Sequence, residues 1–413
     1  MEPNKIREYC LNCINKPCSK LGCPLNNDIP NFIHEEDAKK AFEILSNTTV
    51  LPVICGRICP HEKQCEGKCV RGINGEPVSI GEMEAYIGNR AIENGYKIPV
   101  EIDEKLTNKK VAIIGSGPAG ITCGAFLARK GVKVTIYEKY NELGGLMVHG
   151  IPEFRLSKEI VKTSIDKILE LGIDVQTGKE LGKNFSIEEL KEEYDAVFLS
   201  IGANIPSKMN IVGEDLDGVF GGNSLLEMGK HPSYKNKKVA VIGGGNVAMD
   251  TARTIKRLGA EKVYIIYRRE EEQMPAERKE IAEAKREEVE FLFKTNVIRI
   301  LGSSYVEKIE CIKTELVQKE GDSRLYPVNI KNSNYLMDMD YVVMAIGGVA
   351  EDSAVKNFDR DEKGYIKTNE NMETSIKGVF AGGDVVGERK TVAWAARSGR
   401  DAAEKIIKKL KEI

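Results

Sequence analysis

The chain has 413 residues, of which 30% are charged and 41% are hydrophobic, and its formal net charge at pH 7 is -2. This length exceeds one ordinary hydrophobic core, so we expect two or three domains of a soluble globular protein. The near-neutral charge argues against nucleic acid or an anionic membrane surface as a partner, and no apolar run approaches the roughly 20 residues that span a bilayer. We also expect no signal peptide, so the sequence predicts a cytoplasmic protein.

Eight of the ten cysteines lie within residues 10–69. They form two runs, Cys10-x2-Cys13-x4-Cys18-x4-Cys23-Pro24 and Cys55-x3-Cys59-Pro60-x4-Cys65-x3-Cys69. A reducing compartment disfavours a disulfide framework, and zinc sites favour paired C-x2-C knuckles or mixtures of Cys and His. Two sets of four thiols, each with a Cys-Pro pair, are more typical of iron–sulfur ligation. The residues alone therefore predict two all-cysteine 4Fe–4S clusters, with two structural zinc sites as the alternative.

The cysteine runs are embedded in short helical segments. Residues 38–52 predict a helix and a turn, and residues 77–95 predict a longer helix. We expect a helical iron–sulfur domain over residues 1–105 that has little core of its own and depends on its clusters for stability. The isolated Cys123 and Cys311 are expected to be ordinary buried residues.

A dinucleotide-binding pattern begins after this domain. Residues 109–139 read as strand, glycine turn, helix and strand, with the fingerprint Gly115-x-Gly117-Pro118-Ala119-Gly120 and an acid, Glu138, at the end of the second strand. The glycines allow a tight turn and close approach to a pyrophosphate, which the helix N-terminus also attracts. Glu138 is expected to bind ribose hydroxyls, as in an FAD site.

The same pattern returns at residues 237–270. The turn is Gly243-x-Gly245-Asn246-Val247-Ala248, and the second strand ends in Arg268-Arg269 without an acid at the ribose position. Two guanidiniums would bind a 2′-phosphate through charge-assisted hydrogen bonds, so this fold is predicted to take NADPH. The alternative is that both arginines are merely solvated at a strand end.

Later segments are assigned to the FAD fold. Residues 340–347 read as a buried strand that includes Ala345 and ends in Gly347. Residues 379–384 read as a strand that ends in Gly383-Asp384. The helix after Thr391 would point its N-terminus at the flavin ring. We therefore expect an FAD-binding domain over residues 106–222 and 341–413, into which an NADPH-binding domain of residues 223–340 is inserted. The polar residues 315–335 predict a surface hairpin of the latter.

The order of these segments resembles a known family. The cysteine-rich domain, GSGPAG, GGLMVHGIPEFRL, GGGNVAMD, YRREEEQMPAE and AGGDVVG follow one another as in the small (beta) subunit of NADPH-dependent glutamate synthase. The chain is equally similar to the N-terminal half of dihydropyrimidine dehydrogenase, to the large subunit of the electron-bifurcating ferredoxin–NADP transhydrogenase and to sulfide dehydrogenase flavoproteins. The resemblance covers nearly the whole chain and is specific for the electron-transfer module, not for the final reaction.

The resemblance implies a fold class, α/β with two Rossmann-like domains after an α-helical domain that holds two 4Fe–4S clusters. It also implies the ligands. One cluster would take Cys10, Cys13, Cys18 and Cys69, and the other would take Cys23, Cys59, Cys65 and Glu84. Cys55 would then be no ligand, which disagrees with the all-cysteine interpretation of the spacing.

The resemblance further gives roles to residues near the flavin. Leu146 and Arg155 resemble flavin-site residues, and Lys179 matches a lysine that would stabilise reduced flavin. The alternative for Lys179 is an ordinary surface lysine.

These features predict an electron relay. NADPH would reduce FAD by hydride transfer, and the clusters would pass single electrons to a partner, either a larger catalytic subunit of a multi-subunit reductase or synthase, or ferredoxin. The leading hypothesis is the large subunit of glutamate synthase. The alternatives are a subunit of another reductase similar to dihydropyrimidine dehydrogenase, a ferredoxin–NADP oxidoreductase or transhydrogenase, and, in another class, a zinc-stabilised redox-sensing module.

Overall fold

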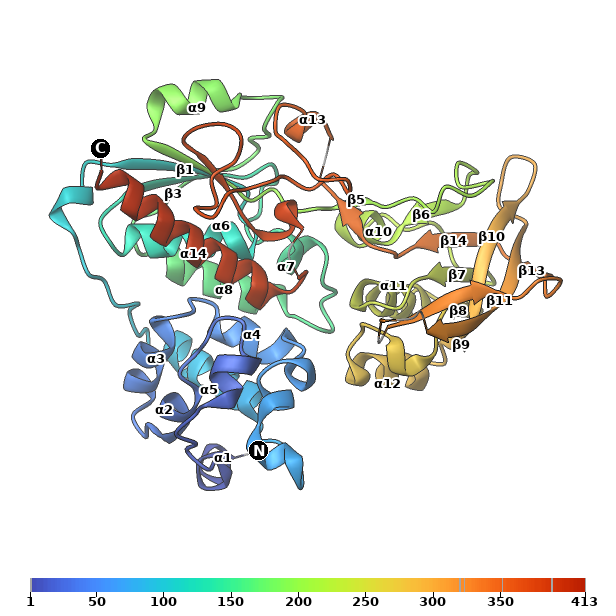
Figure 1. Ribbon diagram of the computed structural model, residues 1–413, viewed down its shortest axis with the longest axis horizontal. Helices are drawn as coiled ribbons and strands as arrows, with labels where there is room; N and C mark the ends of the chain where they lie inside the picture. Colours follow the sequence, from blue (N-terminus) through green and yellow to red (C-terminus); the bar gives the residue numbers. More distant parts are fainter. Residues whose placement is uncertain (1, 319–320, 323, 351, 388, 413) are drawn as a thin grey trace. The chain divides into compact units, whose positions relative to one another are not determined.

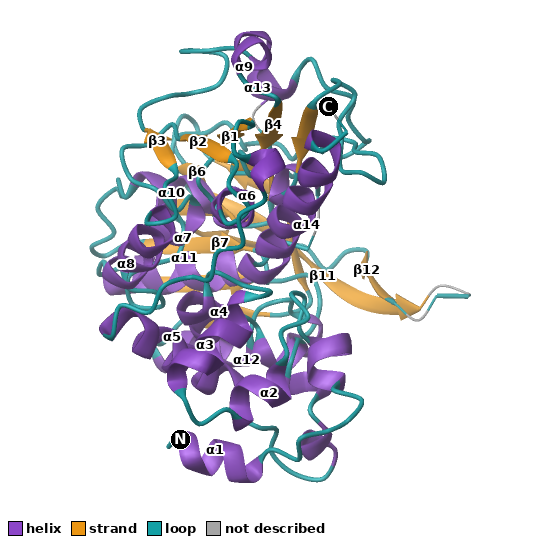
Figure 2. Cartoon of the chain, turned by 90° about the vertical axis from the view of Figure 1, so that its left-hand side faces the viewer, coloured by secondary structure: helices purple, strands orange, loops and turns teal. Residues whose placement is uncertain are grey.

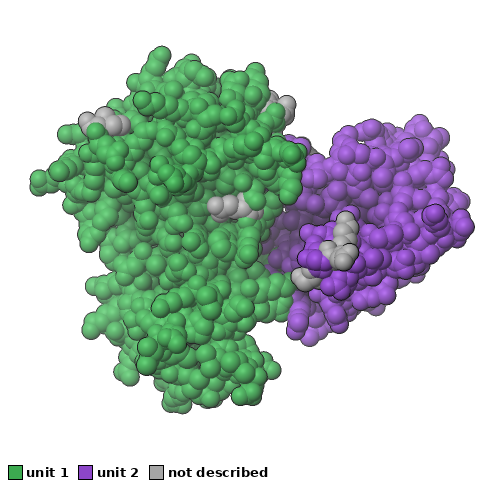
Figure 3. All heavy atoms as spheres, viewed as in Figure 1, with its two compact units in different colours: residues 1–148, 153–203, 350–413 green, residues 149–152, 204–349 purple. Residues whose placement is uncertain are grey.

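The computed structural model describes residues 2–318, 321–322, 324–350, 352–387 and 389–412. The chain divides into two compact units (Figure 3). Unit 1 comprises Met1–Val148, Glu153–Ala203 and Ala350–Ile413, and unit 2 comprises His149–Pro152 and Asn204–Val349. Within the described ranges, none of the helices has the length and apolar character that crossing a membrane requires.

The N-terminal part of unit 1 is built from short helices (Figure 1). They are α1 (Pro3–Tyr9), α2 (Ile29–His34), α3 (Ala38–Ser46), α4 (Pro52–Ile58) and α5 (Ile80–Glu93), with a π turn η1 (Cys18–Gly22) and 3-10 turns η2 (His61–Lys63), η3 (Glu66–Lys68) and η4 (Val70–Ile73). Prolines begin α1 and α4, where the missing N–H is not needed, and the Asp37 carboxylate caps α3.

This helical part has an apolar core, contrary to the expectation from the sequence. Phe32, Ile33, Leu45, Ile54 and Met83 are all completely buried. Their positions in short helices hid the pattern, because each helix supplies only two or three core residues. The polypeptide can therefore hold its shape partly through hydrophobic packing and not through cluster binding alone.

Two of these helices, α4 and α5, cross in close contact. A Cβ atom added to Gly56 would lie 2.4 Å from the backbone nitrogen of Ala85 and 2.6 Å from the carbonyl oxygen of Gly81. No side chain fits between the two backbones at this point. The crossing therefore places Glu84, which precedes Ala85, beside the cysteine-bearing end of α4.

We predict that Gly56→Ala destabilises the helical part by about 1–3 kcal/mol, because the added methyl group must push two backbones apart. Thermal unfolding, followed by circular dichroism, measures the loss. The matched control is Gly72→Ala in the same part of the chain, where the nearest atom to an added Cβ lies at 3.7 Å. Equal stability of both variants would contradict the proposed close packing.

The rest of unit 1 is a parallel sheet with the strand order β16-β4-β1-β2-β3. The strands are β1 (Lys110–Ile114), β2 (Lys133–Tyr137), β3 (Asp174–Gln176), β4 (Ala196–Leu199) and β16 (Val379–Ala381), and the helices are α6 (Pro118–Ala128), α7 (Leu146–His149), α8 (Lys158–Leu169), α9 (Ile187–Glu193), α13 (Asp352–Val355) and α14 (Val392–Leu410), with 3-10 turns η5 (Glu104–Leu106) and η7 (Gly383–Val386). The chain runs from β1 outward to β3 and then returns to β4. This reversal opens a crevice at the carboxyl end of β1, where such sheets bind ligands.

Unit 2 contains a second five-stranded parallel sheet, β6-β14-β7-β8-β9, a four-stranded antiparallel sheet of β10, β11, β12 and β13, and a two-stranded antiparallel sheet of β5 and β15. Its strands are β5 (Ile205–Pro206), β6 (Val219–Gly221), β7 (Lys238–Ile242), β8 (Lys262–Ile266), β9 (Glu290–Leu292), β10 (Thr295–Leu301), β11 (Lys308–Gln318), β12 (Leu325–Asn329), β13 (Tyr335–Asp338), β14 (Tyr341–Met344) and β15 (Gly348–Val349), and its helices are α10 (Gly222–Met228), α11 (Asn246–Arg257) and α12 (Arg278–Arg286), with a 3-10 turn η6 (Glu271–Gln273). Strands β11 and β12 pair antiparallel, as a hairpin requires (Figure 2). The predicted α/β class with two Rossmann-like folds after a helical part is confirmed.

The compact units differ from the expected boundary between the two dinucleotide folds at three segments, residues 149–152, 204–222 and 341–349, which lie in unit 2. Strand β14, which the sequence placed in the FAD fold, pairs in parallel with β7 on one side and β6 on the other. Residues 204–222 and 341–349 therefore belong to the second fold. The physical reason is that β6 and β14 complete the sheet around β7, an arrangement that the local sequence pattern of a buried strand cannot reveal.

Candidate functional site

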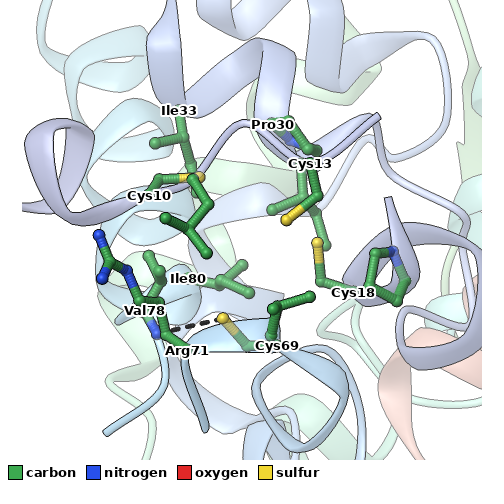
Figure 4. A pocket seen from close by; sticks show the side chains of 13 residues that line it. Cys10, Cys13, Cys18, Pro30, Ile33, Cys69, Arg71, Val78 and Ile80 are labelled. Atoms are coloured by element: carbon green, nitrogen blue, oxygen red, sulfur yellow. Dashed lines mark hydrogen bonds between the residues drawn. The ribbon is translucent and has the colours of Figure 1, made fainter. Parts of the chain in front are cut away.

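Four cysteine side chains in the helical part meet at one pocket (Figure 4). We call Cys10, Cys13, Cys18 and Cys69 the first thiol group. Apolar side chains, among them Pro30, Ile33, Val78 and Ile80, line the same pocket. The backbone N–H of Val78 donates a hydrogen bond to Cys69 Sγ at 3.5 Å. All ten cysteines of the chain are free thiols, so a disulfide framework is absent.

The chemistry of this group fits a soft, multiply charged metal centre. Burial, and to a smaller extent the neighbouring Cys69 and Cys10, raise the pKa of the Cys18 thiol to about 11 although hydrogen bonds with Ser19 lower it. Such thiols become thiolates only when a strong positive charge binds beside them. Among the described residues, no three or more His, Cys, Asp or Glu side chains are arranged to hold a single metal ion.

A second set of donors lies deeper in the same part of unit 1. We call Cys23, Cys59 and Cys65 the second thiol group. Burial and then the neighbouring Glu84 raise the pKa of Cys23 to about 12. For Cys65, burial and then the charges of Cys23 and Glu84 raise the thiol pKa. The side chains are therefore close enough to act on one another electrostatically.

Glu84 and Cys55 are the two candidates for the fourth ligand of the second cluster, and both adjoin the second thiol group. Glu84 is 5% exposed and influences the pKa values of all three thiols. Burial raises the pKa of its carboxyl to about 8 even though the hydrogen bond from Asn27 Nδ2, 3.1 Å long, acts to lower it. Cys55 is fully buried and hydrogen-bonds the Cys59 side chain, which raises the pKa of Cys59. Five donors thus act on one another, one more than a four-ligand cluster would need.

The first glycine turn has the geometry of a dinucleotide cradle. A Cβ atom on Gly120 would lie 2.0 Å from the Gly115 carbonyl oxygen, whereas a Cβ on Gly117 would meet nothing within 4 Å. Helix α6 begins at Pro118 and Ala119, and no side chain caps its N-terminus. This uncapped helix N-terminus fits a pyrophosphate, whose oxygens would accept hydrogen bonds from its N–H groups.

Glu138 is held in place at the edge of this cradle. Its carboxylate is 4% exposed and accepts hydrogen bonds from the backbone N–H of Ser116 at 2.9 Å and from Ser116 Oγ at 2.5 Å. The backbone N–H of Tyr140 donates to its other oxygen at 3.0 Å. Ser116 was not singled out as a site residue from the sequence, although it lies between the fingerprint glycines Gly115 and Gly117 and contacts the acid directly.

The segment after β16 brings Gly383 and Asp384 to the first fold. The backbone N–H of Gly383 donates to Ser398 Oγ at 2.8 Å, so helix α14 fixes this turn. Burial raises the pKa of Asp384. The Thr391 hydroxyl accepts a hydrogen bond from the backbone N–H of Trp394 at 3.3 Å and caps α14. Ser398 was not singled out from the sequence.

The other residues predicted to lie near the flavin are Leu146, Arg155 and Lys179, which come from separate segments of unit 1. Leu146 begins the short helix α7, and Arg155 lies in the turn that precedes α8. The backbone N–H of Lys179 donates to the Glu138 carbonyl at 2.9 Å, and its side chain is exposed. Lys179 therefore lies next to the acid expected to bind ribose, and its role at the flavin ring stays a prediction.

The second glycine turn is equally close-packed. Gly243 has a φ of 145°, and a Cβ atom there would lie 2.2 Å from the Ala345 carbonyl oxygen. Ala345 and Gly347 thus belong to the second dinucleotide fold, and not to the first as the sequence suggested. Helix α11 starts with Asn246, Val247 and Ala248 behind the N-cap Gly245, again without a side-chain cap.

The two predicted phosphate-binding arginines follow β8. Arg268 is exposed, and Arg269 is half-buried. The Arg269 Nε atom is buried and lacks a hydrogen-bond partner among the described residues. An unpaired buried guanidinium N–H costs free energy unless a ligand satisfies it. This feature fits an anionic group such as a 2′-phosphate.

Two protein families match the chain. The family described as pyridine nucleotide-disulphide oxidoreductase matches residues 109–399, and the family described as dihydropyrimidine dehydrogenase domain II, 4Fe-4S cluster, matches residues 4–96. The second match favours iron–sulfur ligation over the zinc alternative. It does not give the number of clusters.

Several known proteins are similar along most of the chain. The glutamate synthase [NADPH] small chain of Halomonas elongata is 37% identical over 96% of this chain and 89% of its own length. The NADP+-dependent formate dehydrogenase subunit beta of Moorella thermoacetica is 33% identical over 97% of this chain and 60% of its own length. The structure of Mycobacterium tuberculosis FprA in complex with NADPH, 21% identical, covers 74% of this chain and 85% of its own with a TM-score of 0.66, which supports the fold.

Proposed function

The chain belongs to the family of NADPH-dependent FAD and iron–sulfur oxidoreductases that includes the small chain of glutamate synthase, and from this premise we propose that it is the electron-input subunit of a larger enzyme. It is an NADPH-dependent oxidoreductase that binds FAD and a 4Fe–4S cluster. The proposal adds two clusters, their ligands, and a larger catalytic subunit as electron acceptor, with the large subunit of glutamate synthase as the leading candidate.

The observation that carries this proposal is the pair of thiol groups in the same compact unit as the first dinucleotide fold. An enzyme that only moved hydride between nicotinamide and flavin would not need them. Bound FAD accepts a hydride as an electron pair, and bound iron–sulfur clusters pass electrons singly to an acceptor.

The residues of the chain would then bind the two nucleotides, FAD and NADPH, and orient them toward each other. The N-termini of α6 and α11 would hold the two pyrophosphates, and Glu138 would fix the FAD ribose. Arg268 and Arg269 would select the phosphorylated nicotinamide nucleotide. Gly383 and Asp384, held by α14, would position the flavin chain. Hydride transfer needs distance and orientation, so no general base is required.

The surface beside the first thiol group supports a protein partner. Ile14, Leu21 and Ile73 lie on the loops that carry these cysteines, and their side chains are 95%, 74% and 74% exposed. Lys20 and Lys68 are exposed on the same loops. We propose that an acidic face of the larger subunit covers these apolar side chains and pairs with the exposed Lys20 and Lys68.

In line with the resemblance, we propose that Glu84, and not Cys55, is the fourth ligand of the second cluster: its carboxylate is buried beside the second thiol group and is oriented by the hydrogen bond from Asn27 Nδ2. Glu84→Ala is predicted to lose the electron paramagnetic resonance signal of one cluster, whereas Cys55→Ala keeps both signals. Iron analysis of both proteins gives the same comparison. Loss of a cluster in Cys55→Ala with full loading in Glu84→Ala would reverse the assignment.

Anaerobic affinity purification from the native cells tests the proposal. We expect a stoichiometric larger subunit with amidotransferase and synthase activity to accompany the chain. A different catalytic subunit, for example one that oxidises formate or reduces pyrimidines, would replace the glutamate synthase assignment and keep the electron-input role. A chain that elutes alone under anaerobic conditions would contradict the subunit proposal and favour ferredoxin as acceptor.

A further inference from the structure

Helix α14 contacts both parts of unit 1 within four residues. Ser398 accepts a hydrogen bond from the Gly383 backbone N–H, and a Cβ atom on Gly399 would lie 2.0 Å from the Ala119 carbonyl oxygen. These two residues therefore face the first dinucleotide fold. The flanking Arg397 and Arg400 lie in the first half of α14 and face the helical part instead, which the N-terminal end of α14 approaches (Figure 1).

Both arginines donate to backbone carbonyls that directly follow a cysteine of the second thiol group. Arg397 Nη1 donates to the Pro24 carbonyl at 3.1 Å, and Arg400 Nη1 donates to the Leu25 carbonyl at 2.7 Å. Pro24 and Leu25 come immediately after Cys23. Asp401 accepts hydrogen bonds from both guanidiniums, at 3.2 Å from Arg397 Nε and 3.0 Å from Arg400 Nη2, and so orients both and offsets one of their two positive charges.

A second chain of hydrogen bonds leads from Arg400 to Glu84. Arg400 Nη1 also donates to the Thr48 carbonyl at 3.3 Å. The Thr48 hydroxyl donates to Asn27 Oδ1 at 2.8 Å, and Asn27 Nδ2 donates to Glu84 Oε1 at 3.1 Å. Arg400 is only 9% exposed and Asn27 only 1%, so water competes little for these bonds. The helix that holds the Gly383 turn thus reaches both Cys23 and Glu84.

We propose that Arg400, assisted by Arg397, is a positioning residue that fixes the second thiol group relative to the flavin segment and thereby sets the rate of electron transfer between flavin and cluster. This inference rests on the proposed function. Each transfer oxidises reduced flavin by one electron and reduces the cluster by one electron. Two transfers would remove the electron pair that NADPH supplies with its hydride, and the proton of that hydride would be released to solvent. The rate falls steeply with donor–acceptor separation, so a small displacement of the Cys23 loop has a large effect.

The test compares Arg400→Met with Arg129→Met in the anaerobic holoenzyme. Arg129 is a matched control because it also joins the first dinucleotide fold to the helical part, donating to the Ser46 carbonyl at 2.5 Å and the Pro99 carbonyl at 2.7 Å, but neither acceptor adjoins a cysteine. Stopped-flow absorbance after mixing with NADPH separates flavin reduction from the later transfer to iron. Amide hydrogen exchange over residues 24–28 gives a readout that is independent of activity.

We expect Arg400→Met to leave flavin reduction unchanged, to slow the transfer to iron by at least about 10-fold, and to speed exchange over residues 24–28. Arg129→Met should change none of these quantities. An unchanged transfer rate in Arg400→Met, or an equal slowing in Arg129→Met, would overturn the proposal. If Arg400→Met does not fold, the less buried Arg397→Met replaces it, with a smaller slowing expected and an unchanged rate again decisive against the proposal. Wild-type iron that NADPH never reduces would instead refute the proposed function, and this inference with it.

Discussion

Replacing Cys18 by alanine is expected to reduce electron delivery to the partner subunit by at least about 100-fold, because a relay that loses a centre must transfer over a much longer distance. Cys18 is 8% exposed and lines the pocket of the first thiol group with Cys10, Cys13 and Cys69. NADPH oxidation by a dye that takes electrons directly from flavin should stay at the wild-type rate. The two assays, run anaerobically on the same preparation, separate flavin reduction from the outward relay.

The matched control is Cys311→Ala. Cys311 is completely buried in β11 of unit 2 and belongs to neither thiol group. The Cys311→Ala variant loses a buried sulfur, as Cys18→Ala does. It should keep both activities, electron delivery to the partner subunit and NADPH oxidation by the dye. The apolar core around Phe32 and Ile54 should keep Cys18→Ala folded, which circular dichroism checks. Wild-type delivery to the partner by Cys18→Ala would remove the first thiol group from the electron route.

The second prediction with a large expected effect concerns the preference for NADPH over NADH. Arg268→Ala and Arg269→Ala are each expected to lower kcat/KM for NADPH by about 10- to 150-fold, which corresponds to the loss of a hydrogen bond to a charged group. The value for NADH, which has no 2′-phosphate, should not change. Raising the salt concentration should weaken the wild-type preference, because the exposed Arg268 acts through a screened charge.

Arg286→Ala is the control for nucleotide choice. The Arg286 guanidinium pairs with Glu283 on the same helix, α12, and is largely exposed. Its removal changes the charge of unit 2 by the same amount but should leave both kcat/KM values unchanged. Equal losses with NADPH and NADH in the Arg269 variant would show that the residue supports the fold and does not recognise the phosphate.

Local patterns in the sequence identified both dinucleotide folds because their signals are contiguous. Strand, glycine turn and helix follow one another within about 30 residues, as the βαβ unit requires. The strand at residues 341–344 was assigned to the wrong fold, because an apolar run does not say which sheet it joins. Only the pairing of β14 with β7 and β6 decides that question.

The two thiol groups show a different limit of prediction from the sequence. Spacing alone suggested two sets of four consecutive cysteines, yet the pocket of the first thiol group takes Cys69 from the second run. The resemblance implied this exchange, and the structure brings these four side chains together. The bonds from Arg397 and Arg400 to residues 24, 25 and 48 span more than 350 positions of sequence. No local sequence pattern could have predicted these hydrogen bonds. Every residue has a backbone carbonyl, so the residue type does not show which carbonyl accepts a hydrogen bond.

The most direct test of the central claim is an iron and sulfide count on the anaerobically purified, ⁵⁷Fe-enriched chain, followed by Mössbauer spectra before and after NADPH is added. The account predicts about eight iron and eight sulfide per chain, the content of two 4Fe–4S clusters, and a fraction of that iron reduced by NADPH. Zinc in place of iron, or iron that stays oxidised while the flavin is reduced, would contradict the claim that the cysteine groups carry electrons out of the flavin.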